Sequence, residues 1–205
     1  MSEETEKRTG SFLREPQMII ALSAIVLSVC GLFVAVYEAA LERQAHRASV
    51  WPSVEVSASL NPGSVRIWAR NTGVGPAQIE TAAVIAAGSK RESWALAVES
   101  IIGDAVHDVG YYQSMITGRV QAADAEREVI FEIKGDVGSA NGDAAEKIRR
   151  AINDREFDVA LCYCSVYETC WTTRLQALVD RMRGSEPVES AVEVESCASE
   201  PRSRI

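Results

Sequence analysis

The sequence contains little histidine and no long basic run. Only two histidines, His46 and His107, occur in 205 residues, so a Ser-His-Asp triad or a histidine-ligated metal site would have to use one of them. No cluster of Lys and Arg exceeds two consecutive residues, and the formal net charge is −8. Because binding to a phosphate backbone normally needs a basic stripe, this charge argues against a nucleic-acid partner. A CxxC pair, typical of redox sites and zinc knuckles, is also absent.

Charged residues are missing from 18–37, which reads MIIALSAIVLSVCGLFVAVY. A helix of this length, rising about 1.5 Å per residue, reaches about 30 Å and matches the hydrocarbon core of a bilayer. The alternative is a cleaved signal peptide. However, the apolar run is longer than a typical signal h-region, and no small-x-small cleavage site follows it. The sequence therefore predicts a retained single-pass transmembrane helix.

The segments around the apolar run are polar or amphipathic. We expect a polar N-terminal segment at 1–17 and a helical stalk at 38–49. Lys and Arg are nearly balanced on the two sides, so the pattern leaves the orientation in the membrane open. Small residues would let two copies of the anchor approach closely and are compatible with a homo-oligomer. They are Ser23, Ser28, Cys30 and Gly31.

Residues 50–183 predict a β-rich globular domain. The expected strands are 53–60, 64–70, 78–87, 112–120, 127–133, 157–167 and 170–178, and the expected helices are 92–102 and 143–153. The turn NPG joins the first two strands as a hairpin. About seven short strands with two small helices favour an immunoglobulin-like antiparallel sandwich, and an α+β domain is the alternative. Residues 184–205 are rich in Glu, Ser and Pro, which predicts a disordered acidic tail.

Cys162, Cys164 and Cys170 lie close together in the stretch LCYCSVYETCW. In an extended strand, positions i and i+2 point to the same face about 7 Å apart, so the first two cysteines share a face but are too distant for a direct bond. A two-residue turn at 168–169 would pair Cys170 with Tyr167 and place it on the opposite face. A longer loop or a bulge would reverse that placement.

Three interpretations of the three cysteines stay open: buried free thiols in a strand, a disulfide among them, or metal or redox chemistry. Cysteine is among the most commonly buried residue types, so free thiols in the core are the default expectation. Unpaired cysteines are typical of a reducing compartment, which favours a cytoplasmic domain.

The stretch NTGVGPA follows the second predicted strand. A glycine-rich loop can hold a phosphate when a helix begins directly after it, but here a proline and a β-rich run follow. Asn71 and Gly73 tolerate a positive φ in a turn, and Pro76 limits pairing at the start of the next strand. We therefore interpret Asn71, Gly73, Gly75 and Pro76 as a structural turn.

The stretches WARNTGVGPAQI and CYCSVYETCW resemble those of uncharacterised bacterial single-pass membrane proteins with an N-terminal transmembrane helix. The first stretch is also similar to turns of immunoglobulin-like modules. The resemblance covers the anchor and most of 50–175. It implies an immunoglobulin-like β domain and, because its motifs are structural, transfers no active site.

Together these features predict a membrane-anchored, non-enzymatic binding or sensing module in the bacterial inner membrane. The ligand is not indicated, and no cofactor is implied. The expected partners are the lipid bilayer and a protein. The alternative is a structural or accessory subunit of a membrane protein complex. A thiol-based redox or metal protein built on the three cysteines is the third hypothesis.

Overall fold

A computed structural model describes residues 16–184 and 191–199 of the chain. Helix α1 (Pro16–Ser49) joins the predicted transmembrane segment and stalk in one helix of 34 residues. Among the described residues, α1 is the helix long and apolar enough to cross a membrane, and none of its apolar window is buried within the chain. A signal sequence meets the same criteria of length and composition. The predicted polar segment 1–17 lies outside the described residues, apart from its last two positions.

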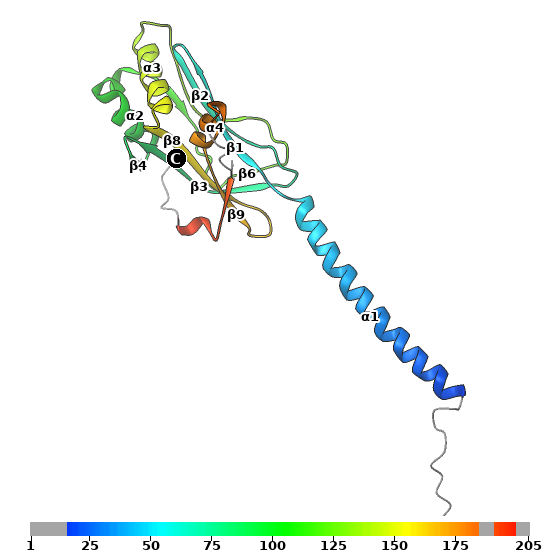
Figure 1. Cartoon of the computed structure of the whole chain (residues 1–205). Helices are drawn as coiled ribbons and strands as arrows, with labels where there is room; N and C mark the ends of the chain where they lie inside the picture. The colour runs from blue at the N-terminus through cyan, green and yellow to red at the C-terminus, as the bar shows by residue number, and fades with distance from the viewer. Residues whose placement is uncertain (1–15, 185–190, 200–205) are drawn as a thin grey trace, which may run out of the picture. The chain divides into compact units, whose positions relative to one another are not determined.

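The chain after α1 forms a separate unit built on two antiparallel sheets (Figure 1). The first sheet has the order β1 (Val54–Asn61), β2 (Ser64–Asn71), β7 (Glu128–Lys134), β5 (Tyr111–Gln113). The second has the order β10 (Ala191–Val194), β9 (Cys170–Arg174), β8 (Phe157–Cys164), β3 (Ala77–Ala86), β4 (Ser89–Arg91), and β6 (Val120–Gln121) also pairs with β3. The helices are α2 (Trp94–Ile102), α3 (Ala140–Asn153) and α4 (Leu175–Met182), with 3-10 turns η2 (Gly103–Asp108) and η3 (Cys197–Ser199).

This architecture confirms the prediction of an N-terminal apolar helix followed by a mainly antiparallel β domain with helices. The predicted hairpin is also confirmed: β1 and β2 pair from Val54–Asn71 to Asn61–Ser64. Along β2, every second side chain from Val65 onward is buried, because the period of two puts one face of the strand into the core.

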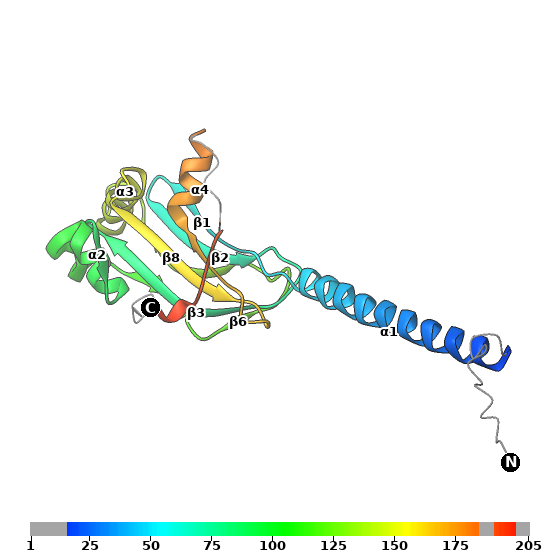
Figure 2. The same cartoon turned by 60° about the horizontal axis from the view of Figure 1, so that its bottom comes forward.

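The apolar core lies between the two sheets and under α2 and α3, which sit together at one end of them (Figure 2). Trp94 of α2 stacks on Phe131 of β7 at a ring-centroid distance of 4.8 Å. Ile148 of α3 and Leu161 of β8 have no exposed surface. Each large apolar side chain buried in this way stabilises the fold by about 1.5–3 kcal/mol.

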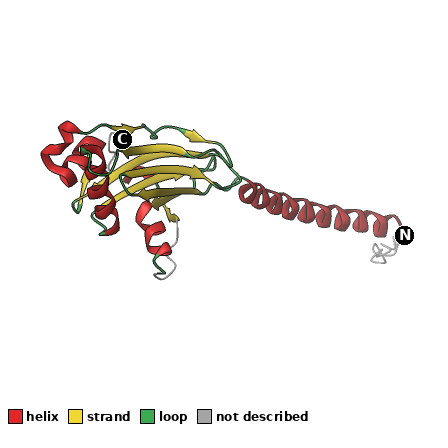
Figure 3. Ribbon diagram, turned by 90° about the horizontal axis from the view of Figure 1, so that it is seen from above, coloured by secondary structure: helices red, strands yellow, loops and turns green. Residues whose placement is uncertain are grey.

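Strand β8 is buried on both faces. Phe157, Val159, Leu161 and Tyr163 belong to the core between the sheets, whereas Cys162 lies in a separate buried cluster on the other face. That outer face is covered by η3, which contacts β3, β8 and β9. The layered arrangement of the strands is seen in Figure 3.

Three of the predicted strands end elsewhere. Strand β8 stops at Cys164 and β9 starts at Cys170, which is paired with Cys164, so the expected turn at 168–169 and the Tyr167–Cys170 pair are wrong. The longer loop 165–169 is closed by a hydrogen bond of 2.8 Å from the Ser165 N–H to the Thr169 carbonyl. The predicted strand 170–178 turns into α4 after Arg174. The predicted strand 112–120 is reduced to β5 and β6 near its two ends.

The expectation of a disordered acidic tail at 184–205 is wrong for 191–199. Val192 pairs with Thr172 and Val194 with Cys170, so β10 extends the second sheet beyond β9. This pairing satisfies backbone groups that would otherwise form an open sheet edge. The ordered domain therefore continues past its predicted end at residue 183. The tail positions 185–190 and 200–205 lie outside the described residues.

Candidate functional site: a double-disulfide cluster

Four cysteines meet on the outer face of the second sheet. Cys162 and Cys164 share one face of β8, Cys170 lies opposite Cys164 on β9, and Cys197 begins η3. Cys162 is bonded to Cys197, with a Cα–Cα distance of 5.6 Å, and Cys164 is bonded to Cys170, with a Cα–Cα distance of 4.0 Å. The first disulfide ties the C-terminal segment to the central strand, and the second closes the loop 165–169.

The two disulfides contact each other. The Sγ atoms of Cys164 and Cys197, which are not bonded, lie 3.7 Å apart. Cys162, Cys170 and Cys197 are buried, whereas Cys164 is half-buried. Cys164 is therefore the most exposed residue of the cluster.

The cysteine expectations are only partly met. Free buried thiols are wrong, because all three predicted cysteines are disulfide-bonded. The alternative of a disulfide among the three is correct for Cys164 and Cys170. As expected from their spacing along the strand, Cys162 and Cys164 are not bonded to each other. Cys197 was missed because the composition of its segment pointed to disorder. Because these cysteines are paired, they no longer favour a cytoplasmic domain.

The sulfurs of Cys164, Cys170 and Cys197 lie within 4.8 Å of one another, which is the kind of grouping that can hold a metal ion. Zinc and other soft metals bind deprotonated thiols. In the disulfide form none of these sulfurs is a thiolate, so the cluster acts here as a covalent staple. The remaining cysteine, Cys30, is free and exposed on α1.

Asn71 ends β2, and its side chain is fully buried. Its Oδ1 accepts hydrogen bonds from the backbone N–H groups of Ser53 (3.1 Å) and Gly73 (3.0 Å). Its Nδ2 donates to the carbonyls of Gly75 (2.7 Å) and of residues 121 and 122 (3.3 and 3.1 Å). One side chain thus connects the start of the domain, the turn after β2 and the segment that follows β6.

The glycines of the turn let it lie directly against the chain at 50–53. A Cβ added to Gly73 would lie 2.4 Å from the carbonyl oxygen of Trp51, and one on Gly75 would lie 1.8 Å from that of Val50. Gly73 does not adopt the positive φ that the sequence suggested. Close backbone approach is therefore what requires glycine here, and Pro76 then leads into β3.

Trp51, two positions beyond the end of α1, packs on the domain that follows. Its ring centroid lies 5.1 Å from that of Trp171, which lies 5.7 Å from that of Tyr163. The backbone N–H of Val74 donates to the Trp51 carbonyl at 3.0 Å. Exposed apolar side chains therefore gather around the loops 72–76 and 165–169, and we name them the loop patch. They are Trp51, Val74, Val166 and Tyr167.

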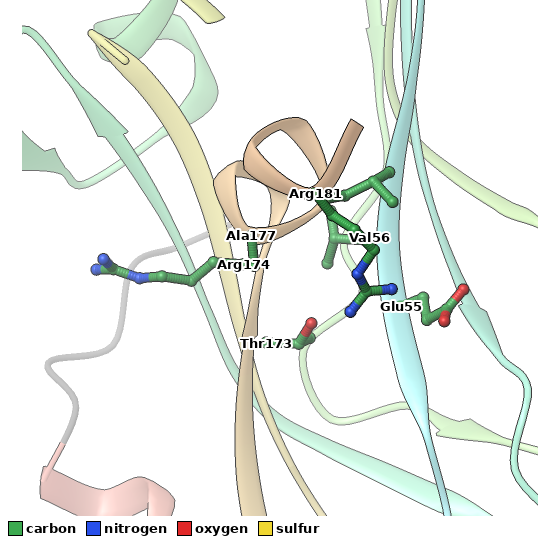
Figure 4. A pocket seen from close by; sticks show the side chains of 7 residues that line it. Glu55, Val56, Thr173, Arg174, Ala177 and Arg181 are labelled. Atoms are coloured by element: carbon green, nitrogen blue, oxygen red, sulfur yellow. The ribbon is translucent and has the colours of Figure 1, made fainter. Parts of the chain in front are cut away.

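A small cavity between β1, β9 and α4 measures only about 10 Å³ (Figure 4). Arg181 reaches from α4 toward β1, which carries Glu55, whereas Arg174 points away from the cavity. A volume of this size holds at most one water molecule. The cavity therefore offers no room for an organic ligand.

An open groove of about 470 Å³ crosses the first sheet beside β5 and β7. Its lining residues are Tyr112, Ser114, Arg119, Glu128, Val129 and Glu132. Both carboxylates already have partners, since Arg119 pairs with Glu128 and Arg66 with Glu132, each at 2.5 Å. The groove is therefore a solvated, charge-balanced surface with no carboxylate left to attract a cation.

Asp158 is a buried acid on β8. Its Oδ1 accepts hydrogen bonds from the backbone N–H groups of Gln176 (3.0 Å) and Val159 (2.8 Å). Burial raises the pKa of Asp158, and these two bonds and the nearby Arg174 guanidinium oppose the rise. Because Gln176 lies in the first turn of α4, Asp158 caps that helix from a neighbouring strand. This role is structural.

No protein-family model matches the chain, and no curated protein or solved structure shows significant similarity to it. The function must therefore be inferred from the arrangement of its own residues.

Proposed function

We propose that the protein is a membrane-anchored binding or sensing module whose β domain lies on the oxidising side of a bacterial inner membrane. The observation that carries the proposal is the pair of disulfides in a domain that starts directly after an apolar helix. Disulfides persist in the periplasm and outside the cell and are rare in the cytosol. The proposal replaces the cytoplasmic placement that the sequence favoured.

The proposal treats α1 as a retained anchor. A signal peptide is cut near the end of its apolar run, after small residues. Here the helix continues without interruption from the apolar segment to Ser49. The contacts of Asn71, Gly73 and Gly75 hold residues 50–53 on the domain, so the segment directly after α1 is part of the folded domain.

The strand order supports an immunoglobulin-like sandwich. Constant-type immunoglobulin domains have sheets in the orders A-B-E-D and C-F-G. With the short strands β4 and β6 set aside, β1-β2-β7-β5 corresponds to A-B-E-D and β3-β8-β9 to C-F-G. The disulfides differ from the B–F bridge of antibody domains: one joins the strands that correspond to F and G, and the other joins the F strand to η3.

In this scheme Val74 of the loop patch lies on the B–C loop, and Val166 and Tyr167 lie on the F–G loop, whereas Trp51 precedes strand A. The B–C and F–G loops carry binding residues in variable immunoglobulin domains. Exposed aromatic and aliphatic side chains on neighbouring loops are typical of a protein-binding surface. We therefore propose a protein partner and a non-enzymatic role in which the loop patch makes the contact.

The side of the membrane can be tested with a Val137→Cys variant in a Cys30→Ser background. Val137 is 81% exposed, so a cysteine there should react with a membrane-impermeant maleimide. We expect labelling in intact cells from which the outer membrane has been removed. Labelling only after the inner membrane is permeabilised would overturn the proposed side.

The binding surface can be tested by placing a photo-crosslinking amino acid at Tyr167, with the same group at Val137 as a control. Position 137 lies near the start of β2, because the N–H of Gly135 donates to the carbonyl of Gly63 there. The loop patch lies beyond the opposite end of β2. We expect a discrete protein adduct from position 167 and none from 137. Equal adducts from both positions, or none from 167, would contradict the proposed surface.

A further inference from the structure

The contact between the two disulfides has a chemical consequence. A thiolate exchanges with a disulfide by attacking one of its sulfurs directly. In this cluster a sulfur of one disulfide already lies 3.7 Å from a sulfur of the other. Opening one disulfide would therefore leave a thiol in position to attack the second.

We propose that the cluster is a thiol–disulfide exchange site. A dithiol reductant opens the Cys164–Cys170 disulfide, and Cys164 then takes over Cys197 from Cys162. The proposal adds a chemical input to the binding or sensing role and does not depend on the identity of the protein partner.

The first step begins at Cys164, the half-buried residue of the cluster. A thiolate of the reductant bonds to Cys164 Sγ, the Cys164–Cys170 bond breaks, and Cys170 leaves with the electron pair and is protonated. The second thiol of the reductant then attacks the reductant sulfur that is bonded to Cys164. The reductant closes into a disulfide, and Cys164 leaves as a thiolate. Two electrons have passed from the dithiol, which leaves as a disulfide, to the protein.

The second step is internal and consumes no reductant. Cys164 Sγ bonds to Cys197 Sγ, the Cys162–Cys197 bond breaks, and the electron pair leaves on Cys162, which takes a proton. One disulfide is replaced by another, so there is no net oxidation or reduction.

The exchange would move the attachment of the C-terminal segment along β8. Cys162 and Cys164 share one face of the strand, so the shift from one to the other is about 7 Å toward the loop 165–169. That loop carries Val166 and Tyr167 of the loop patch. The redox state would thereby be transmitted to the proposed binding surface.

The second step can be isolated in a Cys170→Ser variant of the full chain in detergent, with Cys30→Ser as background. This variant keeps the Cys162–Cys197 disulfide and presents Cys164 as its one free thiol. After incubation at mildly alkaline pH, the sample is acid-quenched and alkylated. Chymotrypsin then cleaves after Tyr163 and separates Cys162 from Cys164, so mass spectrometry can assign the free thiol and the disulfide.

We expect the Cys164–Cys197 disulfide, with Cys162 alkylated, in at least about a tenth of the molecules, since both pairings are ordinary cysteine disulfides. The matched Cys164→Ser variant leaves Cys170 as the free thiol. The Cys170 sulfur lies within 4.8 Å of Cys197 but does not make the 3.7 Å contact, so exchange should be slower in this variant. Alkylation at Cys164 alone, or equal exchange rates in the two variants, would overturn the proposal.

The Cys30→Ser protein provides a second test that leaves the cluster intact. Treatment with one equivalent of dithiothreitol, followed by an acid quench, should trap a species with a Cys164–Cys197 disulfide and two free thiols. If only Cys162–Cys197 is found among singly reduced molecules, Cys164 does not attack Cys197 and the proposal is wrong.

Discussion

Replacing Asn71 by alanine removes five hydrogen bonds that join the start of the domain, the turn after β2 and residues 121–122. Two of them, to the carbonyls of Gly75 and Gln121, are buried, so water cannot easily replace them. Each buried polar group left without a partner costs about 1–3 kcal/mol, which gives a loss of about 2–6 kcal/mol in the free energy of unfolding. For a domain of this size, even about 3 kcal/mol lowers the melting temperature by about 6–12 °C. Urea unfolding of the full chain in detergent, followed by tryptophan fluorescence, measures the loss.

Asn141→Ala is the matched control. The Asn141 side chain also makes three hydrogen bonds to backbone groups, at Gly110 and Lys134, but all three are exposed. Water can take their place, so the loss should stay below about 1 kcal/mol. If the two substitutions lower the free energy of unfolding equally, the burial of the Asn71 hydrogen bonds does not increase their contribution to stability, and the reasoning fails.

Two further predictions concern a backbone contact and a buried charge. Gly75→Ala should destabilise the domain by about 3 kcal/mol, because its Cβ would overlap the Val50 carbonyl. Gly110→Ala, whose Cβ meets one side-chain atom at 4.0 Å, should leave the urea midpoint unchanged, and equal effects would refute the crowding argument. Burial raises the folded-state pKa of Asp158. Between the ordinary aspartate pKa and this raised pKa, the folded protein keeps a proton that the unfolded chain has released. The free energy of unfolding therefore falls as the pH rises through this window. Asp158→Asn should remove that part of the pH dependence in urea unfolding; an unchanged slope would contradict it.

The hairpin of β1 and β2 was predictable because its signals are local. Alternating apolar residues on both sides of a short turn determine which side chains face the core, and the structure follows that register. Helix α4 was not predictable in the same way. Arg174 occupies its N-cap without a side-chain cap, and the cap comes instead from Asp158, on another strand. The local sequence therefore carried no signal for the start of a helix.

In the candidate site, too, the features with local sequence signals were predictable and the long-range contacts were not. The sequence placed Cys162 and Cys164 on one face of a strand, which follows from the strand period alone. The partner of Cys162 is Cys197, separated by 35 positions, in a segment whose composition indicates disorder. Likewise, the residues around Asn71 indicated a turn, but its role depends on contacts with residue 53 and residues 121–122, which only the fold brings close. Long-range pairing of this kind leaves no local pattern to detect.

The Cys162–Cys197 disulfide closes a large covalent ring that contains β9, α4 and β10. A protease that cuts the chain once inside this ring cannot shed any part of the domain, because the two pieces stay joined through the sulfurs. Release of either piece after such a cut requires a reductant as well. In the proposed anchored protein, a single cut that frees this domain without a reductant must therefore fall outside the ring, for example in the stalk at 38–49.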